Sequence, residues 1–530
     1  MRGAAGPGSA RAVGGGAYAW YVLAVLFVVY VLNFVDRQIL SILAQDIKAG
    51  LGIGDAQIGI LYGTVFAVFY SVFGIPLGCL VDRWYRFRLI ALGLVVWSAM
   101  TAVSGFATSY AQLAAARVGV GIGEASASPA AYSVLGDYFP RERRALALSI
   151  YSAGLYVGSG VSLPLGGWIA HTWSLHYTAA TAPLGLAGWQ AAFLAVGIPG
   201  LLLALWVRAL REPARGLADG HPTPAAQPGA WRAFGLELAA ILPPLTLWSV
   251  SRYPGALRAN LLLLLVIAAA ATLLADATGD RLQWFPLAVG AYAVCSWVQK
   301  LRATDRPTFQ LLWGTPAVTC LLAATACMTF VTYTSFVWLA PYVIRTFNVR
   351  PDVAGLMLGV PGGFATAAGV IAGGRLSDLW RRRSARGRVY VCMVAVVLTP
   401  PIFAASLTST EVHVFYVLGP LGLTAANMWL GSGAAAIQDS VLPRMRGTAA
   451  ATFFIATTAG LAVGPYFAGR ISVLTGSLRV GILSIFIVSP LALYLLWRAC
   501  RDLPAAEASR ETRAAAAGES AVQAPAGAPA

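Results

Sequence analysis

Charged residues are scarce in this chain of 530 residues. Asp, Glu, Lys and Arg make up only 11% of it, whereas a soluble globular protein carries about 25%. The few charges are also clumped, so that long stretches, such as those between Asp55 and Asp82 or between Arg88 and Arg117, contain none. A membrane-spanning helix needs about 20 predominantly apolar residues. The scarcity of charge therefore argues against a soluble domain and predicts an all-α polytopic membrane protein.

Histidine is rarer still, and the cysteines form no motif. The chain has 4 histidines, all in predicted loops or at helix ends, and 6 cysteines without CxxC or zinc-ligand spacing. No GxxxxGK(S/T) loop for binding ATP phosphates occurs either. These absences argue against a metal site, a membrane-embedded enzyme and an ATP-driven pump. We therefore expect no catalytic residue and no cofactor, with a proton gradient as the energy source.

Acidic residues are outnumbered by basic ones, 21 to 37, which gives a formal net charge of +16. The arginines gather at the ends of predicted helices, as in Arg83 to Arg88 and Arg381 to Arg388, whereas alternate loops such as Thr408 to His413 have few. This alternation sets the orientation of membrane proteins and is not a nucleic-acid footprint. It predicts a cell-membrane protein with both termini in the cytoplasm, in the inner membrane if the source is a Gram-negative bacterium, and no bound nucleic acid.

Two motifs each occur twice. Gly78-Cys-Leu-Val-Asp82-Arg83-Trp84 returns as Gly374-Arg-Leu-Ser-Asp378-Leu-Trp380. Asp137-Tyr-Phe-Pro-Arg-Glu-Arg143 is paralleled by Asp439-Ser-Val-Leu-Pro-Arg-Met-Arg446. The offsets of 296 and 303 residues agree on one duplication. Both copies of each motif are predicted on the cytoplasmic side, so the two halves run parallel.

The offset also predicts how the chain is divided. Six helices with short loops take roughly 200 residues, so an offset near 300 leaves an insertion between the halves. We expect a disordered N-terminus (1–17), a six-helix bundle (18–211), an inserted region (212–310), a second six-helix bundle (311–500) and a disordered tail (501–530). The inserted region holds a Pro-broken interfacial segment (234–250) and two extra spans (260–275 and 283–298), which makes about 14 helices in all. The long stretch 145–207 is expected to fold back between His171 and Gly188.

Ionisable groups within membrane helices are costly, by about 2.5–3.5 kcal/mol on insertion scales, so each one suggests a function. The first predicted helix carries Asn33, Asp36 and Arg37, and the fourth carries Arg117 and Glu124. Seven residues apart, Arg117 and Glu124 share a helix face, which we expect to look into the bundle with Asp36 and Arg37 as counter-charges. A carboxylate that moves away from its arginine in a dry cavity takes up a proton. This predicts a site for substrate binding and proton coupling, with a static salt-bridge network as the alternative.

The second half has almost no charge inside its predicted spans. Its polar and aromatic candidates are Tyr333, Trp338 and Asn427. This asymmetry predicts a cavity that is polar on one side and apolar on the other, suited to an amphipathic anion with its tail against the second half. The run Gly119-Val-Gly121-Ile-Gly123 lies inside a helix with no preceding strand, so it indicates close helix packing and not a dinucleotide loop.

With these motifs assembled, the chain resembles the major facilitator superfamily over about residues 18–211 and 311–500. The loop from Gly78 to Arg86 is similar to the signature loop after helix 2 of that family. The resemblance implies that Asp82 and Arg83 hold a cytoplasmic gate with the end of helix 4 and the start of helix 11. The expected gating residues are Gly78, Asp82, Arg83, Arg86, Asp137, Arg143, Gly374 and Asp378. In the second copy Leu379 replaces the Arg of the signature.

More narrowly, Asn33-Phe-Val-Asp36-Arg37 and Arg117-Val-Gly-Val-Gly-Ile-Gly-Glu124 resemble the spinster-like branch, which includes sphingosine-phosphate and lysophospholipid transporters. The resemblance implies that Asp36, Arg117 and Glu124 line the cavity and that protonation of Asp36 or Glu124 drives transport. One departure is Phe34, where many relatives carry Tyr. The pattern of the first helix is also similar to that of organic anion symporters.

The resulting expectation is a monomeric secondary transporter that moves an amphipathic or organic anion, such as a lysolipid-like molecule, by alternating access with protons. Two alternatives stay open. One is a symporter of hexuronates or aromatic acids. The other is a membrane sensor or scaffold that transports nothing, although a scaffold has no need for charges at Asp36, Arg117 and Glu124.

Overall fold

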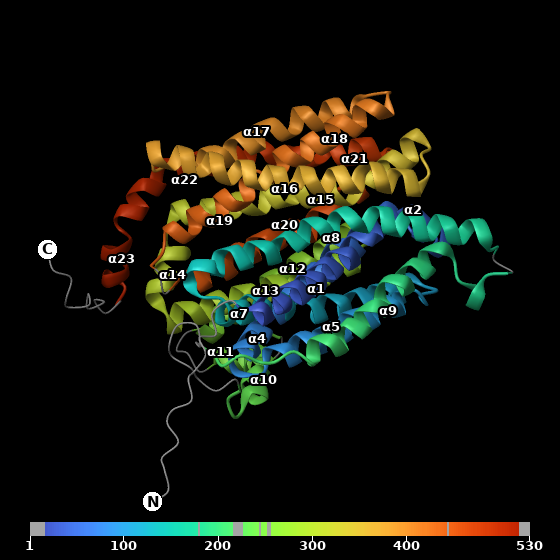
Figure 1. Cartoon of the computed structure of the whole chain (residues 1–530). Coiled ribbons are helices and arrows are strands. Elements are labelled where there is room, and N and C mark those ends of the chain that lie inside the picture. The colour runs from blue at the N-terminus through green and yellow to red at the C-terminus, as the bar shows by residue number, and fades with distance from the viewer. Residues whose placement is uncertain are drawn as a thin grey trace, which may run out of the picture.

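A computed structural model describes residues 16–178, 181–215, 226–242, 245–251, 256–442 and 445–518, and nearly all of the regular structure in them is helical. The first half of the chain comprises α1 (Ala17–Ile42), α2 (Ala44–Leu51), α3 (Asp55–Tyr62), α4 (Thr64–Arg83), α5 (Arg86–Ser104), α6 (Tyr110–Glu124), α7 (Ala127–Tyr138), α8 (Arg141–His176) and α9 (Gly188–Arg208). The second half comprises α15 (Pro316–Phe347), α16 (Pro351–Arg383), α17 (Gly387–Thr408), α18 (Val412–Asn427), α19 (Trp429–Asp439), α20 (Arg446–Thr475), α21 (Leu478–Ser484) and α22 (Ser489–Ala508). Both halves form bundles of long helices lying side by side (Figure 1).

The charge-free stretches of the sequence become the long helices. In the described residues, 12 helical segments are long and apolar enough to cross a membrane. Two further crossings in the predicted count, α6–α7 and α13 (Arg281–Thr304), run beside them but are not among these 12; α6 has only 15 residues and α7 only 12. The predicted reversal between His171 and Gly188 is confirmed, because α8 ends at His176 and α9 begins at Gly188.

The two ends of the bundle differ in what they contain. Tracing the helices from α1 places the start of α1 and the end of α22 at one end, here called the terminal end (Figure 1). The short helix α2 and the turn between α15 and α16 lie at the opposite end, here called the far end. Arg-rich segments such as Arg381–Arg383 lie at the terminal end, as the predicted orientation requires.

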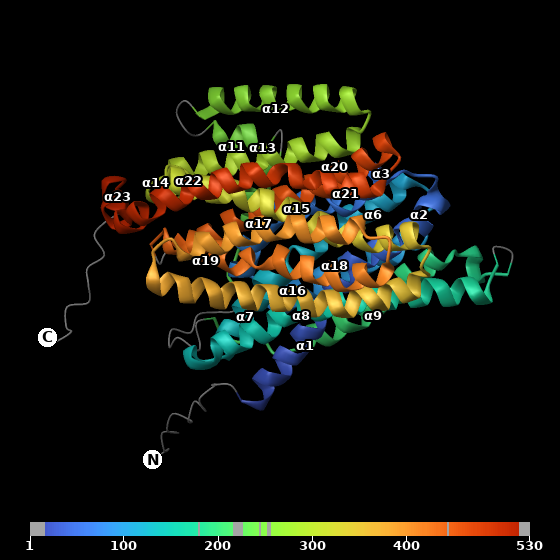
Figure 2. The same ribbon diagram turned by 90° about the horizontal axis from the view of Figure 1, so that it is seen from above.

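The region between the halves forms α10 (Ala230–Ile241), α11 (Leu245–Val250), α12 (Ala256–Thr278), α13 and α14 (Arg306–Leu312). The short helix α10 lies against α4, where Trp231 meets the Trp84 ring edge-on with centroids 5.0 Å apart. Helices α12 and α13 form the predicted hairpin. Figure 2 shows α12 outermost, with α13 between it and the main bundle.

The hairpin is anchored at the junction of the two halves. The buried amide of Gln283 on α13 bonds both Thr64 of α4 and the carbonyl oxygen of Ala462 on α20. Tyr466 of α20 donates a hydrogen bond of 2.8 Å to Asp280 at the start of α13. The insertion therefore contacts one helix from each half along the same seam.

The predicted disordered tail is wrong for residues 501–518. Helix α22 continues to Ala508, and α23 (Arg510–Ala516) follows it and packs on α14. The reason is tertiary: Leu503 and Ala514 are buried, and Glu507 accepts a hydrogen bond of 2.5 Å from Arg381. Residues 519–530, like 1–15, lie outside the described residues.

The glycine run of α6 packs closely, as predicted. A Cβ on Gly121 would lie 2.8 Å from the carbonyl oxygen of Phe66 on α4, and one on Gly123 would lie 2.7 Å from the amide nitrogen of Trp97 on α5. Both distances are shorter than a carbon atom tolerates, so these glycines allow the three helix backbones to approach one another.

We expect Gly123→Ala to lower the melting temperature of the purified protein, because the added methyl group meets backbone that cannot move aside cheaply. Overpacking of this kind costs about 1–3 kcal/mol. The matched control is Gly136→Ala on α7, where a Cβ meets nothing within 4 Å. Equal melting temperatures for the two variants would contradict the packing role of Gly123.

Candidate functional site

The predicted intramembrane charges come together in one buried cluster. We call Asn33, Asp36, Arg37, Arg117 and Glu124 the charge cluster. All but Arg37 are at most 2% exposed. The Nε of Arg37 donates a hydrogen bond of 2.5 Å to Glu124, which is the last residue of α6 before the break that starts α7. Arg117 donates a bond of 3.3 Å to the backbone carbonyl of Asp36, not to its carboxylate.

The charge cluster is not a saturated salt-bridge network. Among the described residues, five of its buried side-chain atoms have no hydrogen-bond partner: Asn33 Oδ1, Asp36 Oδ1, Asp36 Oδ2, Arg117 Nε and Glu124 Oε1. Unpaired buried polar atoms cost free energy, and their concentration at one place is typical of a functional site more than of a structural brace. The pairing expected between the carboxylate of Asp36 and an arginine is absent from this conformation.

Arg37 is held in an aromatic cage. Its guanidinium carbon lies 4.9 Å from the ring centroid of Phe34 and 4.7 Å from those of Phe66 and Tyr70, within the range of cation–π attraction. The side chain keeps 14% of its surface exposed, and its two terminal nitrogens have no hydrogen-bond partner in the described part of the chain. Arg37 is thus a cation fixed in position with donors to spare.

Arg37 faces the other half of the molecule. One turn further along α1, Ser41 donates a hydrogen bond of 2.6 Å to the carbonyl of Val337 on α15. Tyr333, on the same helix, is within electrostatic range of Arg37. A small cavity between the halves is lined by Gln38 of α1 together with Phe336 and Leu339 of α15. The cluster therefore borders the interface between the halves.

The other two candidates of the second half point into their own bundle. Trp338 is fully buried and donates its ring N–H to the carbonyl of Pro465 at 3.0 Å. Asn427 donates to the carbonyl of Leu423, one turn back on its own helix, at 2.7 Å. Of the three predicted polar and aromatic residues, Tyr333 is the one within electrostatic range of Arg37.

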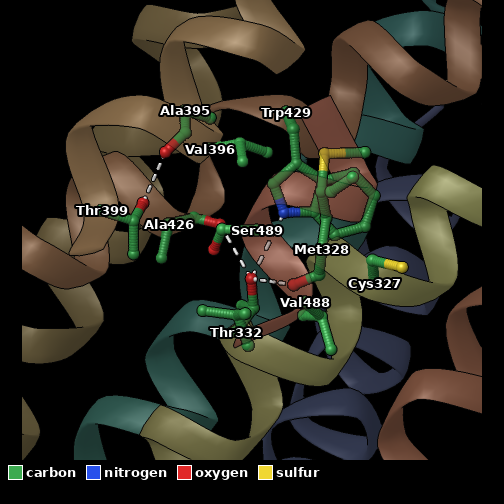
Figure 3. Close-up of a pocket in the computed structure, with 12 residues that line it drawn as sticks. Cys327, Met328, Thr332, Ala395, Val396, Thr399, Ala426, Trp429, Val488 and Ser489 are labelled. Carbon is green, nitrogen blue, oxygen red and sulfur yellow. Dashed lines mark hydrogen bonds between the residues drawn. The ribbon is translucent and has the colours of Figure 1, made fainter. Parts of the chain in front are cut away.

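A separate apolar pocket lies inside the second half, between α15, α17, α18–α19 and the start of α22 (Figure 3). Two of its hydroxyl groups already have partners: Thr332 donates to the Ala426 carbonyl at 2.8 Å, and Thr399 donates to the Ala395 carbonyl at 2.6 Å. No charged side chain lines it. Nothing in the described residues makes it a site for an anion.

The predicted gating motifs lie at the terminal end, and the ion pairs described for them each join residues on the same side of the inserted region. Arg86 is fully buried and pairs with Asp137 and with Glu212, the latter at 2.8 Å. In the second half, Arg388 bridges Asp439 at 2.8 Å and Asp378 at 3.8 Å. Arg143 is exposed, and Gly78 and Gly374 have open space where a Cβ would project.

The gate that the family resemblance implies stays a prediction. The side chains of Asp82 and Arg83 make no hydrogen bond or ion pair with the described residues of the second half. Arg86, another predicted gating residue, joins α5 to α7 through Asp137. The segments expected to complete the gate, at the start of α8 and just before α20, include residues or side chains outside the described part of the chain.

A second charged cluster, which the sequence reasoning missed, joins the halves at the far end. Asp55, at the start of α3, accepts hydrogen bonds of 2.8 and 2.7 Å from the two terminal nitrogens of Arg345 on α15. It also accepts 2.7 Å from Ser472 on α20 and pairs with Lys48 of α2. We call these four residues the far-end lock. Its only sequence signal was that Asp55 and Arg345 both border charge-free stretches.

The backbones of helices from the two halves also pack closely against each other along the interface. A Cβ on Gly59 of α3 would lie 2.4 Å from the carbonyl of Pro465 on α20, and one on Gly355 of α16 would lie 2.4 Å from that of Leu163 on α8. Both seams run from the middle of the bundle to the far end. Among the described residues, no ion pair at the terminal end joins the two halves, whereas the far-end lock does so at the opposite end.

Comparison with known proteins identifies the class to which this architecture belongs. The family model of the Major Facilitator Superfamily matches residues 26–465, and the chain belongs to that family. It is therefore a multi-pass membrane protein, and its family and fold indicate a transporter and not an enzyme. Within the described part of the chain, no three His, Cys, Asp or Glu side chains gather closely enough to hold a metal ion.

The similarity to the spinster-like branch is confirmed. A bacterial homologue of the human lysosomal transporter spinster, solved in an inward-facing and unoccupied conformation, superposes with a TM-score of 0.65 at 25% identity, over 95% of this chain and 97% of the other. Protein spinster of Drosophila melanogaster is 29% identical over 38% of this chain and 31% of its own length.

Other relatives carry different names. An MFS-type efflux pump of Mycolicibacterium smegmatis is 26% identical over 86% of this chain and 84% of the pump. The hexuronate transporter of Bacillus subtilis is 28% identical over 36% of this chain and 42% of its own length. Apart from the pump, the curated relatives named here thus match the chain over less than half their length.

Proposed function

We propose that this protein is a proton-coupled secondary transporter that binds an organic or amphipathic anion at Arg37 and moves it by alternating access. The observation that carries the proposal is the setting of Arg37: a caged cation with free donors, at the interface of two halves that the far-end lock joins. A guanidinium with two free nitrogens can bind a carboxylate or phosphate with paired hydrogen bonds.

In the proposed cycle, the anion competes with Glu124 for the guanidinium of Arg37. Glu124 is completely buried, so losing its partner leaves a carboxylate in dry surroundings, which favours uptake of a proton. The neutral carboxyl then no longer holds Arg37. In this way substrate binding and proton binding are linked through one ion pair.

The sidedness of the cycle follows from the predicted orientation. If both termini are cytoplasmic, the terminal end faces the cytoplasm, and the conformation described here is inward-facing. Its likeness to the inward-facing spinster homologue supports this assignment. The outward-facing state then requires release of the far-end lock and closure around the Asp82 loop.

The names of the relatives support two substrate groups. The resemblance of the charge-cluster motifs to the spinster-like branch favours an amphipathic anion, and the name of the hexuronate transporter favours a small hydrophilic acid. Both carry an anionic group, which is the feature that Arg37 selects.

The test is a thermal-shift screen of the purified protein with lysolipids, sphingoid phosphates, hexuronates and aromatic acids. A ligand that binds only the folded state raises the melting temperature by mass action. We expect at least one anion class to stabilise the protein, and Arg37→Gln to abolish the shift. The matched control is Arg208→Gln, an exposed cation at the terminal end of α9. If no class binds, or if binding survives Arg37→Gln unchanged, the proposed function fails.

A further inference from the structure

The first half carries a continuous series of aromatic rings that leads to Arg37. Tyr132 of α7 meets Tyr151 of α8 edge-on at 5.5 Å, and Tyr151 stacks on Tyr30 of α1 at 4.5 Å. Tyr30 meets Phe34 at 5.3 Å, and Phe34 belongs to the cage of Arg37. We call Tyr132, Tyr151, Tyr30 and Phe34 the aromatic track.

The outer end of this track faces the space between the halves. Tyr132 is 42% exposed, although α7 packs on α1, α4, α5 and α8 of its own half. Tyr156 of α8 lies within electrostatic range of both Tyr132 and Tyr333 of the second half, which places Tyr132 near the interface between the halves. The hydroxyl groups of Tyr132 and Ser152 on α8 lie 2.9 Å apart, which fixes the tyrosine ring in position.

The spacing along α1 sets how far a ligand must reach. Tyr30 and Arg37 are seven residues apart, which corresponds to about 10 Å along the helix. A ligand with its acid group at Arg37 and a body of one or two fused rings matches this distance.

The chemistry of the surface selects the kind of body. Aromatic faces and edges favour another planar ring by about 0.5–1.5 kcal/mol beyond simple burial. A polyhydroxylated acid instead needs a hydrogen-bond partner for each buried hydroxyl group, and among the track residues only the tyrosine hydroxyls offer one. The sequence predicts an apolar cavity wall on the second half. The aromatic track adds an aromatic surface on the first half, next to Arg37.

We propose that the substrates are aromatic carboxylates with a planar body of one or two rings, bound with the carboxylate on Arg37 and the ring against Tyr132 and Tyr30. This inference rests on the proposed function and narrows its substrate class. Tyr132 acts as a specificity-determining residue, because it is the exposed member that an incoming ring meets first.

The experiment is isothermal titration of the purified full chain with three probes: 2-naphthoate, its saturated analogue decahydronaphthalene-2-carboxylate, and galactarate. We expect 2-naphthoate to bind about tenfold more tightly than the saturated acid and galactarate to bind more weakly than either. Tyr132→Leu should weaken binding of 2-naphthoate about three- to tenfold without affecting the saturated acid, and Tyr132→Phe should restore it. The control is Tyr494→Leu, a tyrosine of similar exposure on α22.

The outcomes separate the two proposals. Equal affinity for the planar and saturated acids, or an unchanged affinity in Tyr132→Leu, overturns the aromatic assignment. Preferential binding of galactarate, or of lysophosphatidylglycerol added as a fourth probe, overturns it as well but leaves the proposed anion transporter standing. Failure of every anion to bind removes both.

Discussion

Replacing Asp55 with asparagine is expected to shift the protein away from the conformation closed at the far end. The carboxylate is 4% exposed and joins segments of both halves through Arg345 and Ser472. An amide cannot accept both N–H groups of Arg345 and pair with Lys48 as well. Hydrogen bonds to charged groups contribute about 1.5–3 kcal/mol, and because Arg345 keeps a third of its surface in solvent, we expect a change near the lower value, or about tenfold in the conformational ratio.

Distances between spin labels at Leu175 and Leu474 would measure this shift. Both side chains are exposed near the far end, on α8 and α20 of opposite halves. A population with a longer distance should appear in Asp55→Asn. The control is Asp352→Asn at the same end, because the partner of Asp352 is Arg350 in its own half. An unchanged distance distribution in Asp55→Asn would show that the lock does not hold the two halves together.

The second large effect is expected from Glu124→Gln. The glutamine keeps the size of the side chain but can neither neutralise Arg37 nor exchange a proton. In proteoliposomes, uptake driven by a pH gradient should fall at least about tenfold, the size of effect that general proton-transfer groups commonly have. Exchange of substrate across the membrane without a gradient should persist, because it needs no net movement of protons.

Comparing these two assays in the same preparation distinguishes a loss of proton coupling from a loss of folded protein. A misfolded protein loses both activities, whereas an uncoupled one loses only the gradient-driven uptake. Asp36→Asn serves as the second variant, since its carboxylate is buried without a partner in the same cluster. Glu411→Gln, an exposed acid just before α18, is the control. Full gradient-driven uptake in both cluster variants would remove Glu124 and Asp36 from the proton path.

Much of the architecture was predictable because it depends on composition along the chain. Charge is expelled from hydrocarbon wherever it stands, so the charge-free stretches mark the helices without knowledge of their neighbours. The repeated Asp82 and Asp378 motifs revealed two parallel halves in the same way. The charges of α1 and α6 also predicted the buried cluster, because an ionisable group inside a membrane helix costs free energy and is rarely present without a partner or a function.

The details of the site were not predictable, because they depend on how distant segments meet. Asp55 and Arg345 are 290 residues apart, and neither occupies a conspicuous position in the sequence. The sequence predicts Trp338 as a cavity residue, but its ring N–H donates a hydrogen bond to the carbonyl of Pro465 inside the second bundle. The helix at residues 501–508 depends on its contacts, such as that between Glu507 and Arg381, and not on its own composition.

The sequence by itself therefore determined the membrane helices, the two halves with their inserted hairpin, and the residues of the charge cluster. Only the tertiary structure decided that Arg37 pairs with Glu124, that its aromatic surroundings belong to the first half, and that Asp55 locks the far end. The physical reason is range. The free energy of transferring a segment into the membrane is a sum over the segment's own residues. Ion pairs and ring contacts instead depend on distances of a few ångströms between helices, and these distances change when the halves move.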